Sequence, residues 1–194
     1  DKIFRRADYQ QISIGPRYTH DWNKDWYTGV EYEYSDRNYE SPFENRDREH
    51  HTVKALVGYN ALERTDVTLG AGFSTTQTSK NTEFGIEVDR SYDDILVELE
   101  LAFNLPQRWE ATLGTKYRHR DYTSNEPTDI AHYNRVDDLW AVGAEVGKWF
   151  RKDLFLALEA GWACNDSNRD DPTVEADEVG YEEYTVGINA EWRF

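Results

Sequence analysis

The last fourteen residues of the chain alternate strictly between apolar and polar or small side chains. One row runs in steps of two from Tyr184 to Phe194, and the intervening row runs from Glu183 to Arg193. Alternation with a period of two is typical of a strand with one apolar and one polar face. Because the apolar row begins and ends with aromatic residues, it has the layout of a membrane strand whose apolar band lies between two aromatic girdles.

The same period recurs along the rest of the chain. In the clearest internal case, Ile95, Val97 and Leu99 alternate with Glu98 and Glu100. None of these segments has the i, i+3, i+4 spacing of an amphipathic helix. With the C-terminal strand they make nine predicted strands, the first eight being 9–20, 26–35, 52–62, 67–77, 95–104, 109–121, 139–149 and 154–165.

The connections between these segments alternate in length. Short ones cover 20–25, 63–66, 106–108 and 151–153, and long polar ones cover 36–51, 78–93, 122–138 and 166–179. Outer-membrane barrels have short periplasmic turns and long outer loops. We therefore expect an all-β fold, an antiparallel up-and-down transmembrane β-barrel. Residues 1–194 then form a single barrel domain, or the C-terminal part of a longer barrel.

The hairpin units have charged loop shoulders that contain tyrosine, at 36–39, 89–92 and 120–122. In these units and in its terminal strand, the chain resembles bacterial outer-membrane β-barrel proteins, the family of β-barrel porins. The resemblance implies a location in the bacterial outer membrane and a mature chain without its signal peptide. It also implies contact with lipid and lipopolysaccharide, and recognition of the strand ending in Phe194 by the barrel-assembly machinery. Such a fold does not identify a substrate.

Composition alone suggests a different class. The chain has 38% hydrophobic residues, a net charge of −16 and a mean hydropathy of −0.88, as in a soluble or disordered acidic protein. Seven Trp, thirteen Tyr and eight Phe are too many for a solvated tail. A barrel strand needs only alternate apolar residues, so low hydropathy is compatible with a barrel. The negative charge excludes nucleic acid as a partner.

Nine strands are an odd number, whereas single-chain bacterial barrels have even numbers. Free sheet edges also invite aggregation. We therefore expect the barrel to be completed by an upstream segment or by another copy in a homo-oligomer.

Period two also predicts which side chains face inward. Small residues, mostly glycines such as Gly70 and Gly143, lie among charged ones in the inward rows. The charged residues expected to line the lumen are Arg17, Glu31, Glu33, Lys54, Glu98, Glu100, Glu110, Lys116, Arg118, Arg120, Glu145, Glu159, Glu183, Glu191 and Arg193. The aromatic residues expected in the membrane girdles are Trp26, Trp109, Trp140, Trp162, Tyr184, Trp192 and Phe194.

These rows leave several functions open. The lumen is either filled by paired charges, as in narrow barrels, or forms a conduction path in which the excess of carboxylates favours cations. We expect a small porin or an exporter-type channel component with a charged, glycine-lined lumen. One alternative is a non-conducting anchor, or a self-assembling barrel with acidic surface loops. Another is a soluble secreted barrel that binds an apolar ligand.

Signals for catalysis and metal binding are weak. None of the five histidines has the spacing of a metal site or a catalytic triad, and no G-x-S-x-G motif occurs. We expect no enzyme activity, no cofactor and no metal. The acidic loops are either solvated or bind divalent cations that bridge to lipopolysaccharide. The single cysteine, Cys164, is either a packing residue or an intermolecular link.

Overall fold

The structure is a computed structural model that describes residues 9–40, 47–62, 64–83, 85–168 and 180–192. Within these residues, no helix is long and apolar enough to span a membrane. One 3-10 turn, η2, covers Pro106–Arg108. The strands are β1 (Tyr9–Ile14), β2 (Arg17–Asp21), β3 (Trp26–Tyr39), β4 (Arg48–Leu62), β5 (Thr65–Thr78), β6 (Asn81–Glu83), β7 (Ile86–Val88), β8 (Tyr92–Leu105), β9 (Trp109–Tyr122), β10 (Val136–Trp149), β11 (Leu154–Ser167) and β12 (Tyr181–Trp192).

The main sheet has ten strands in the order β1-β3-β4-β5-β8-β9-β10-β11-β12, with β2 also paired to β3. Every pairing is antiparallel. Apart from β1–β3 and β5–β8, which skip β2 and the β6–β7 hairpin, each pairing joins strands that follow one another in the chain. β1 and β2 continue the same edge and are separated by Gly15 and Pro16, where proline lacks the N–H that a regular ladder requires. All nine predicted strands are therefore present, and the antiparallel up-and-down architecture is confirmed.

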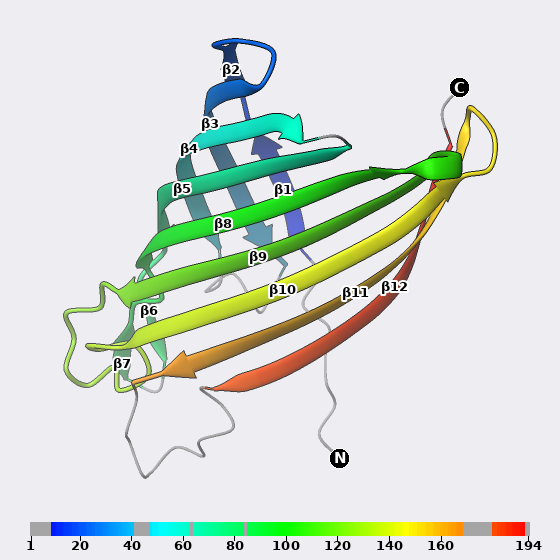
Figure 1. The fold of residues 1–194 in the computed structure, drawn as a ribbon. Helices are drawn as coiled ribbons and strands as arrows, with labels where there is room; N and C mark the ends of the chain where they lie inside the picture. The colour runs from blue at the N-terminus through cyan, green and yellow to red at the C-terminus, as the bar shows by residue number, and fades with distance from the viewer. Residues whose placement is uncertain (1–8, 41–46, 63, 84, 169–179, 193–194) are drawn as a thin grey trace, which may run out of the picture.

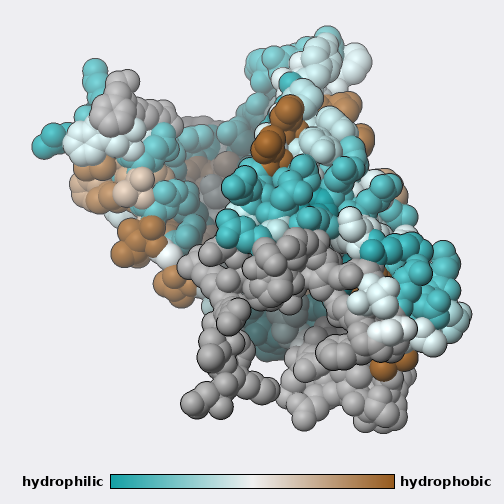
Figure 2. Space-filling view, turned by 180° about the vertical axis from the view of Figure 1, so that it is seen from behind, coloured by the Kyte–Doolittle hydropathy of each residue, from teal (hydrophilic) through white to brown (hydrophobic). Residues whose placement is uncertain are grey.

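The sheet curls into a deep trough that is not closed. β1 and β2 form one edge and β12 forms the other, and among the described residues the two edges do not pair. Figure 1 shows the short connections at one end of the trough and, at the opposite end, the connection between β9 and β10 together with β6 and β7. In Figure 2 the end that carries β6 and β7 is mainly hydrophilic, and apolar patches lie on the arms on either side of the hollow.

The outward face of the sheet is apolar and its inward face carries the charged residues, which is the reverse of the arrangement in a soluble protein. On β8, Ile95 and Val97 point outward and are 56% and 42% exposed, whereas Asp94 and Leu96 point into the trough and are 1% and 2% exposed. The outward row of β12 is still more exposed, with Val186 at 87%. The convex face is thus an apolar surface that water would solvate poorly.

Two expectations about the long connections need correction. Strands extend further into them than predicted, since β3 continues to Tyr39 and β4 begins at Arg48. Both rows of these strand ends are polar, so they lack the apolar alternation that marks the rest of each strand. The 78–93 connection is also not simply a loop, because it holds the β6–β7 hairpin, whose turn includes Gly85 with a φ of +83°.

Candidate functional site on the concave face

The inward rows of the sheet carry the charged residues that period two assigned to the lumen. Strand register fixes their neighbours: Glu31 lies opposite both Arg17 and Lys54, and Glu98 lies opposite Lys116. Fourteen of the fifteen residues lie on described strands in the concave rows, and Arg193 lies outside the described residues. The structure therefore brings these residues to one face, although it does not test what they do there.

Lys54 is the central residue of an ion-pair cluster in the middle of this face. Its Nζ atom lies 3.0 Å from Oε1 of Glu31 on β3 and 3.1 Å from Oε1 of Glu98 on β8. All three side chains are largely buried, with exposed fractions of 17%, 23% and 29%. One ammonium thus joins two carboxylates from opposite sides and crosses β5, which lies between β4 and β8. Paired in this way, charges can line a wall without an unpaired buried ion.

A second charge cluster lies nearer the long loops. The carboxylate of Asp94 is fully buried and accepts hydrogen bonds from Nε of Arg120 at 2.8 Å and from the Ser74 hydroxyl at 3.1 Å. Nε of Arg118 lies 3.6 Å from the same carboxylate. A buried aspartate costs free energy unless it is ionically paired and hydrogen-bonded, and here it is both.

Charge on the concave face is divided along the strands. Towards the short turns, Glu100, Glu110, Glu145 and Glu159 lie in the inward rows, and within the described residues none of them makes an ion pair. Glu145 and Glu159 are direct cross-strand partners, an arrangement of like charges that destabilises a sheet. Within the described residues, the arginines and lysines of the inward rows lie at mid-height or towards the long loops. The sequence alone indicated a mixture of charges rather than this separation.

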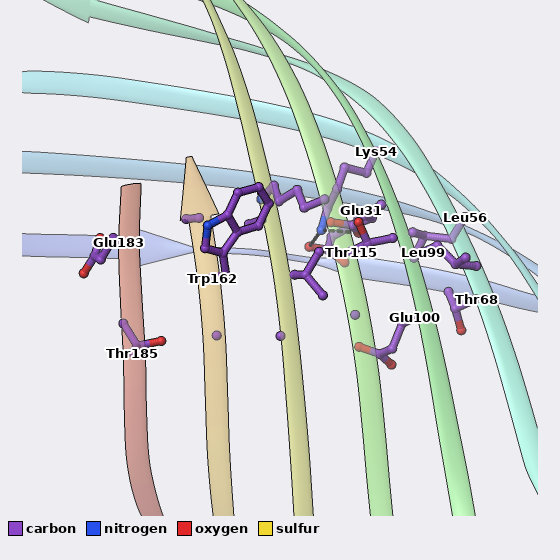
Figure 3. A pocket seen from close by; sticks show the side chains of 18 of the residues that line it. Glu31, Lys54, Leu56, Thr68, Leu99, Glu100, Thr115, Trp162, Glu183 and Thr185 are labelled. Carbon is purple, nitrogen blue, oxygen red and sulfur yellow. Dashed lines mark hydrogen bonds and ion pairs between the residues drawn. The ribbon is translucent and has the colours of Figure 1, made fainter. Parts of the chain in front are cut away.

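A cavity of about 630 Å³ occupies the middle of the trough. Figure 3 shows Glu31 and Lys54 on one side of it and Glu183 and Thr185 of β12 on the other. Glu100 of β8 borders the same space. Part of its wall is a row of glycines that are register partners on β9, β10 and β11, namely Gly114, Gly143 and Gly161. The absence of side chains there leaves the space open.

Aromatic residues border the apolar face at both ends. Near the short turns the ring of Trp26 lies 4.5 Å from that of Tyr59, and near the long loops Trp140 lies 4.5 Å from Tyr117. Trp26, Trp109, Trp140, Tyr184 and Trp192 are all at least 39% exposed. Trp162 is half-buried and also borders the cavity, and Phe194 lies outside the described residues.

From Tyr184 to Trp192 is eight residues, or about 26 Å along a strand. At the tilt of about 35–45° that strands have in outer-membrane barrels, this length spans about 20 Å across the membrane, slightly less than the ~25 Å apolar band of such barrels.

Within the described residues, no group of three or more His, Cys, Asp or Glu side chains is placed to hold a metal ion. His50 contacts Thr76 at 2.7 Å and Thr52 at 2.8 Å, and His51 contacts the Tyr32 hydroxyl at 2.8 Å. These adjacent histidines therefore face opposite sides of β4. Cys164 is a half-buried free thiol.

Sequence reasoning missed several residues of this face because they lie in segments assigned to loops. Asp94 borders the predicted 95–104 strand, and Arg37, Arg48 and Arg135 fall within the predicted long connections. Extending the period-two rows through the polar ends of the strands would have identified Arg37, Arg48 and Asp94 as inward residues. The same extension would have placed Asp137, which is 1% exposed and pairs with Arg135 at 2.7 Å, in the inward row of β10.

No protein-family model matches this chain, and no curated protein matches it in sequence. Among solved structures, it is similar to the beta domain of the Bordetella autotransporter BrkA. The TM-score is 0.47 and the identity is 17%, with 94% of this chain and 77% of that chain covered. Likeness at this level leaves the function to be argued from the residues of the chain itself.

Proposed function

We propose that this chain forms the wall of a bacterial outer-membrane β-barrel that acts as a small porin or an exporter-type channel component. The observation that carries the proposal is the opposed character of the two faces. The convex face is apolar, exposed and bordered by aromatic residues, as a lipid-facing wall must be. The concave face holds ion pairs, uncompensated carboxylates and a cavity of about 630 Å³, as a wetted passage would.

A closed passage needs a partner for the two free edges. In hydrocarbon, each unpaired backbone N–H or C=O costs several kcal/mol. β1 and β12 both run from the long-loop end to the short-turn end, so joining them directly would make a parallel pair. Copies inserted in the same orientation would also meet only in parallel. We therefore favour a further strand of opposite direction between the edges, from a segment of the same protein or from another subunit.

The remaining partners follow from the same location. The convex rows would contact lipid, and the polar loop end would face lipopolysaccharide. The C-terminal strand would be the segment that the barrel-assembly machinery recognises. These partners are proposals that rest on the strand pattern and on the resemblance to outer-membrane barrels.

Planar-bilayer recording of the purified protein tests the channel directly. Discrete conductance steps are expected. Under a salt gradient, the reversal potential should move towards zero when Glu110, Glu145 and Glu159 are replaced by Gln, because these carboxylates favour cations. Heat-modifiable barrel that inserts without conductance would instead support the anchoring or self-assembling alternative. A chain that stays monodisperse without detergent would contradict the membrane assignment and support the soluble barrel.

A further inference from the structure

A second cavity, of about 310 Å³, lies at the long-loop end of the concave face and differs in character from the central one. Threonine and histidine contribute to its lining, but most of its lining residues are arginines and tyrosines. These are Arg48, Arg90, Arg120, Tyr39, Tyr92 and Tyr122. A cavity with three guanidinium groups is unexpected in a chain with a net charge of −16.

Five of these six residues belong to a repeated triplet, Arg-x-Tyr, at 37–39, 90–92 and 120–122, whereas Arg48 lies outside it. In extended backbone, residues two apart point to the same side, so each triplet presents a guanidinium and a phenol together. Register then joins two of the triplets, because Tyr92 and Tyr122 are cross-strand partners with ring centroids 5.7 Å apart. The ends of β3, β8 and β9 thus each contribute a tyrosine to this cavity, although these residues lie far apart in sequence.

The aromatic groups are already arranged around cations. The guanidinium carbon of Arg120 lies 3.7 Å from the Tyr92 ring centroid, and that of Arg135 lies 4.7 Å from the Tyr122 ring centroid. Stacking on a ring holds a guanidinium flat. The edges of Arg120 and Arg135 are already bound to Asp94 and Asp137, so neither is the group that would meet a further anion.

Arg48 differs from Arg120 in its surroundings within the described residues. Within the described residues it makes no hydrogen bond or ion pair, whereas Arg120 is bound to Asp94. Arg48 also lies directly opposite Arg37 in the β3–β4 register, and two like charges in that position repel each other. Arg37 is itself hydrogen-bonded to the neutral side-chain oxygen of Gln11 and stacked on Tyr9 at 4.3 Å. An anion near Arg48 would relieve this repulsion.

We propose that this cavity binds a small organic anion, such as a sugar acid or a sugar phosphate. Its carboxylate or phosphate would pair with Arg48, and its flat face would lie against the tyrosines. Guanidinium groups match the geometry of both oxyanions, and the volume suits one ring-sized molecule. The binding site does not depend on conduction through the trough, so it can stand or fall separately from the channel proposal.

Isothermal titration of the purified protein in detergent tests this site with three probes of similar size: glucuronate, glucose 6-phosphate and glucose. We expect one or both anions to bind, glucose not to bind, and salt to weaken the affinity. The anion that binds more tightly identifies the oxyanion. Absence of binding by both anions would overturn the proposal.

Arg48→Gln should weaken the affinity about tenfold or more, since a charge-assisted contact of this kind is worth at least ~1.4 kcal/mol. The matched control is Arg151→Gln, an exposed arginine in the turn at the opposite end of the sheet. Arg48→Lys should keep part of the affinity, which separates loss of charge from loss of fold. Equal affinities for Arg48→Gln, Arg151→Gln and the unchanged protein would show that the anion binds elsewhere.

Discussion

Gly70 of β5 and Glu98 of β8 are cross-strand partners, and a Cβ atom on Gly70 would lie 2.8 Å from Cγ of Glu98. The missing side chain is what lets Glu98 lean across β5 towards Lys54. The same position would lie 3.0 Å from Cδ2 of Leu56, which is buried. Gly70 therefore makes room both for the ion pair and for the packing beside it.

Replacing Gly70 by Ala should destabilise the folded sheet by about 1–3 kcal/mol, as overpacking of a filled site usually does. Urea unfolding in detergent would measure the change. Gly143→Ala is the matched control, because the nearest atom to its added Cβ would be 3.9 Å away and little cost is expected. Equal destabilisation by both substitutions would show that loss of glycine itself, and not the contact with Glu98, is responsible.

Leu99→Arg tests which face meets lipid. If the outward row of β8 lies at the bilayer midplane, the substitution should cost ~2–4 kcal/mol on reconstitution into lipid. Glu100→Arg, at the adjacent inward position, should cost less. Labelling of single cysteines at positions 99 and 100 in a Cys164→Ser background gives a second readout. Modification of position 99 by an aqueous reagent, with position 100 protected, would reverse the assignment of the faces.

Cysteines at Ser13 and Asn189 test whether the two free edges meet. These residues lie on β1 and β12. We expect a short bifunctional reagent not to join them within one chain, because the further strand that we propose would lie between them. Cysteines at Ala157 and Asn189 are the positive control, since these residues are register partners on β11 and β12. Efficient intrachain linkage of Ser13 to Asn189 would mean that β1 and β12 close the barrel directly.

The long-loop end contains a cluster that should respond to pH. Asp129 accepts hydrogen bonds from the backbone N–H of Asp89 at 3.0 Å and from the Ser124 hydroxyl at 3.1 Å, and its other oxygen lies 2.9 Å from Nδ1 of His132. Burial lowers the pKa of His132 below its usual value of 6.5, and the nearby Arg90 and Arg135 act in the same direction. Its contact with Asp129 opposes this shift without reversing it.

The contacts of Asp129 hold the loop around His132 closed. Because the pKa of His132 is lowered in this closed state, His132 binds a proton more readily when the contacts are broken and the loop is open. Stability of the closed loop should therefore be fully present above pH ~6.5 and should fall as the pH drops below that value. The protection factor of the Asp89 amide, measured by hydrogen exchange between pH 8 and pH 5, reports this directly. In His132→Gln the protection should no longer change over this range. A similar loss of protection in that variant would assign the effect to another group.

The two faces of the sheet were predictable from sequence because strand geometry assigns side chains to faces with a strict period of two. Ile95, Val97 and Val186 lie outward, as their alternation indicated. The contacts across the concave face were not predictable, because they depend on register between distant strands. Lys54 meets Glu98, 44 residues away, only because Gly72 and Gly70 of the intervening strand have no side chains.

The arginine cavity shows the same limit. The segments 36–39, 89–92 and 120–122 were recognisable as charged, tyrosine-containing shoulders of loops, but nothing local shows that they converge. Polar strand ends such as Arg37–Tyr39 have no apolar row by which to recognise them. The β6–β7 hairpin was missed for a related reason, since its strands are three residues each and polar flanks surround them.

The separation of charge along the trough has an electrical consequence. Guanidinium groups gather at the long-loop end and unpaired carboxylates gather towards the short turns, so a conducting pore with this wall would have the fixed charges of a bipolar diode. With the loop side negative, anions enter from that side and cations from the other, and both accumulate at the junction. With the polarity reversed, both are drawn out and the junction is depleted. The passage would thus rectify ionic current, carrying more of it in one direction than in the other.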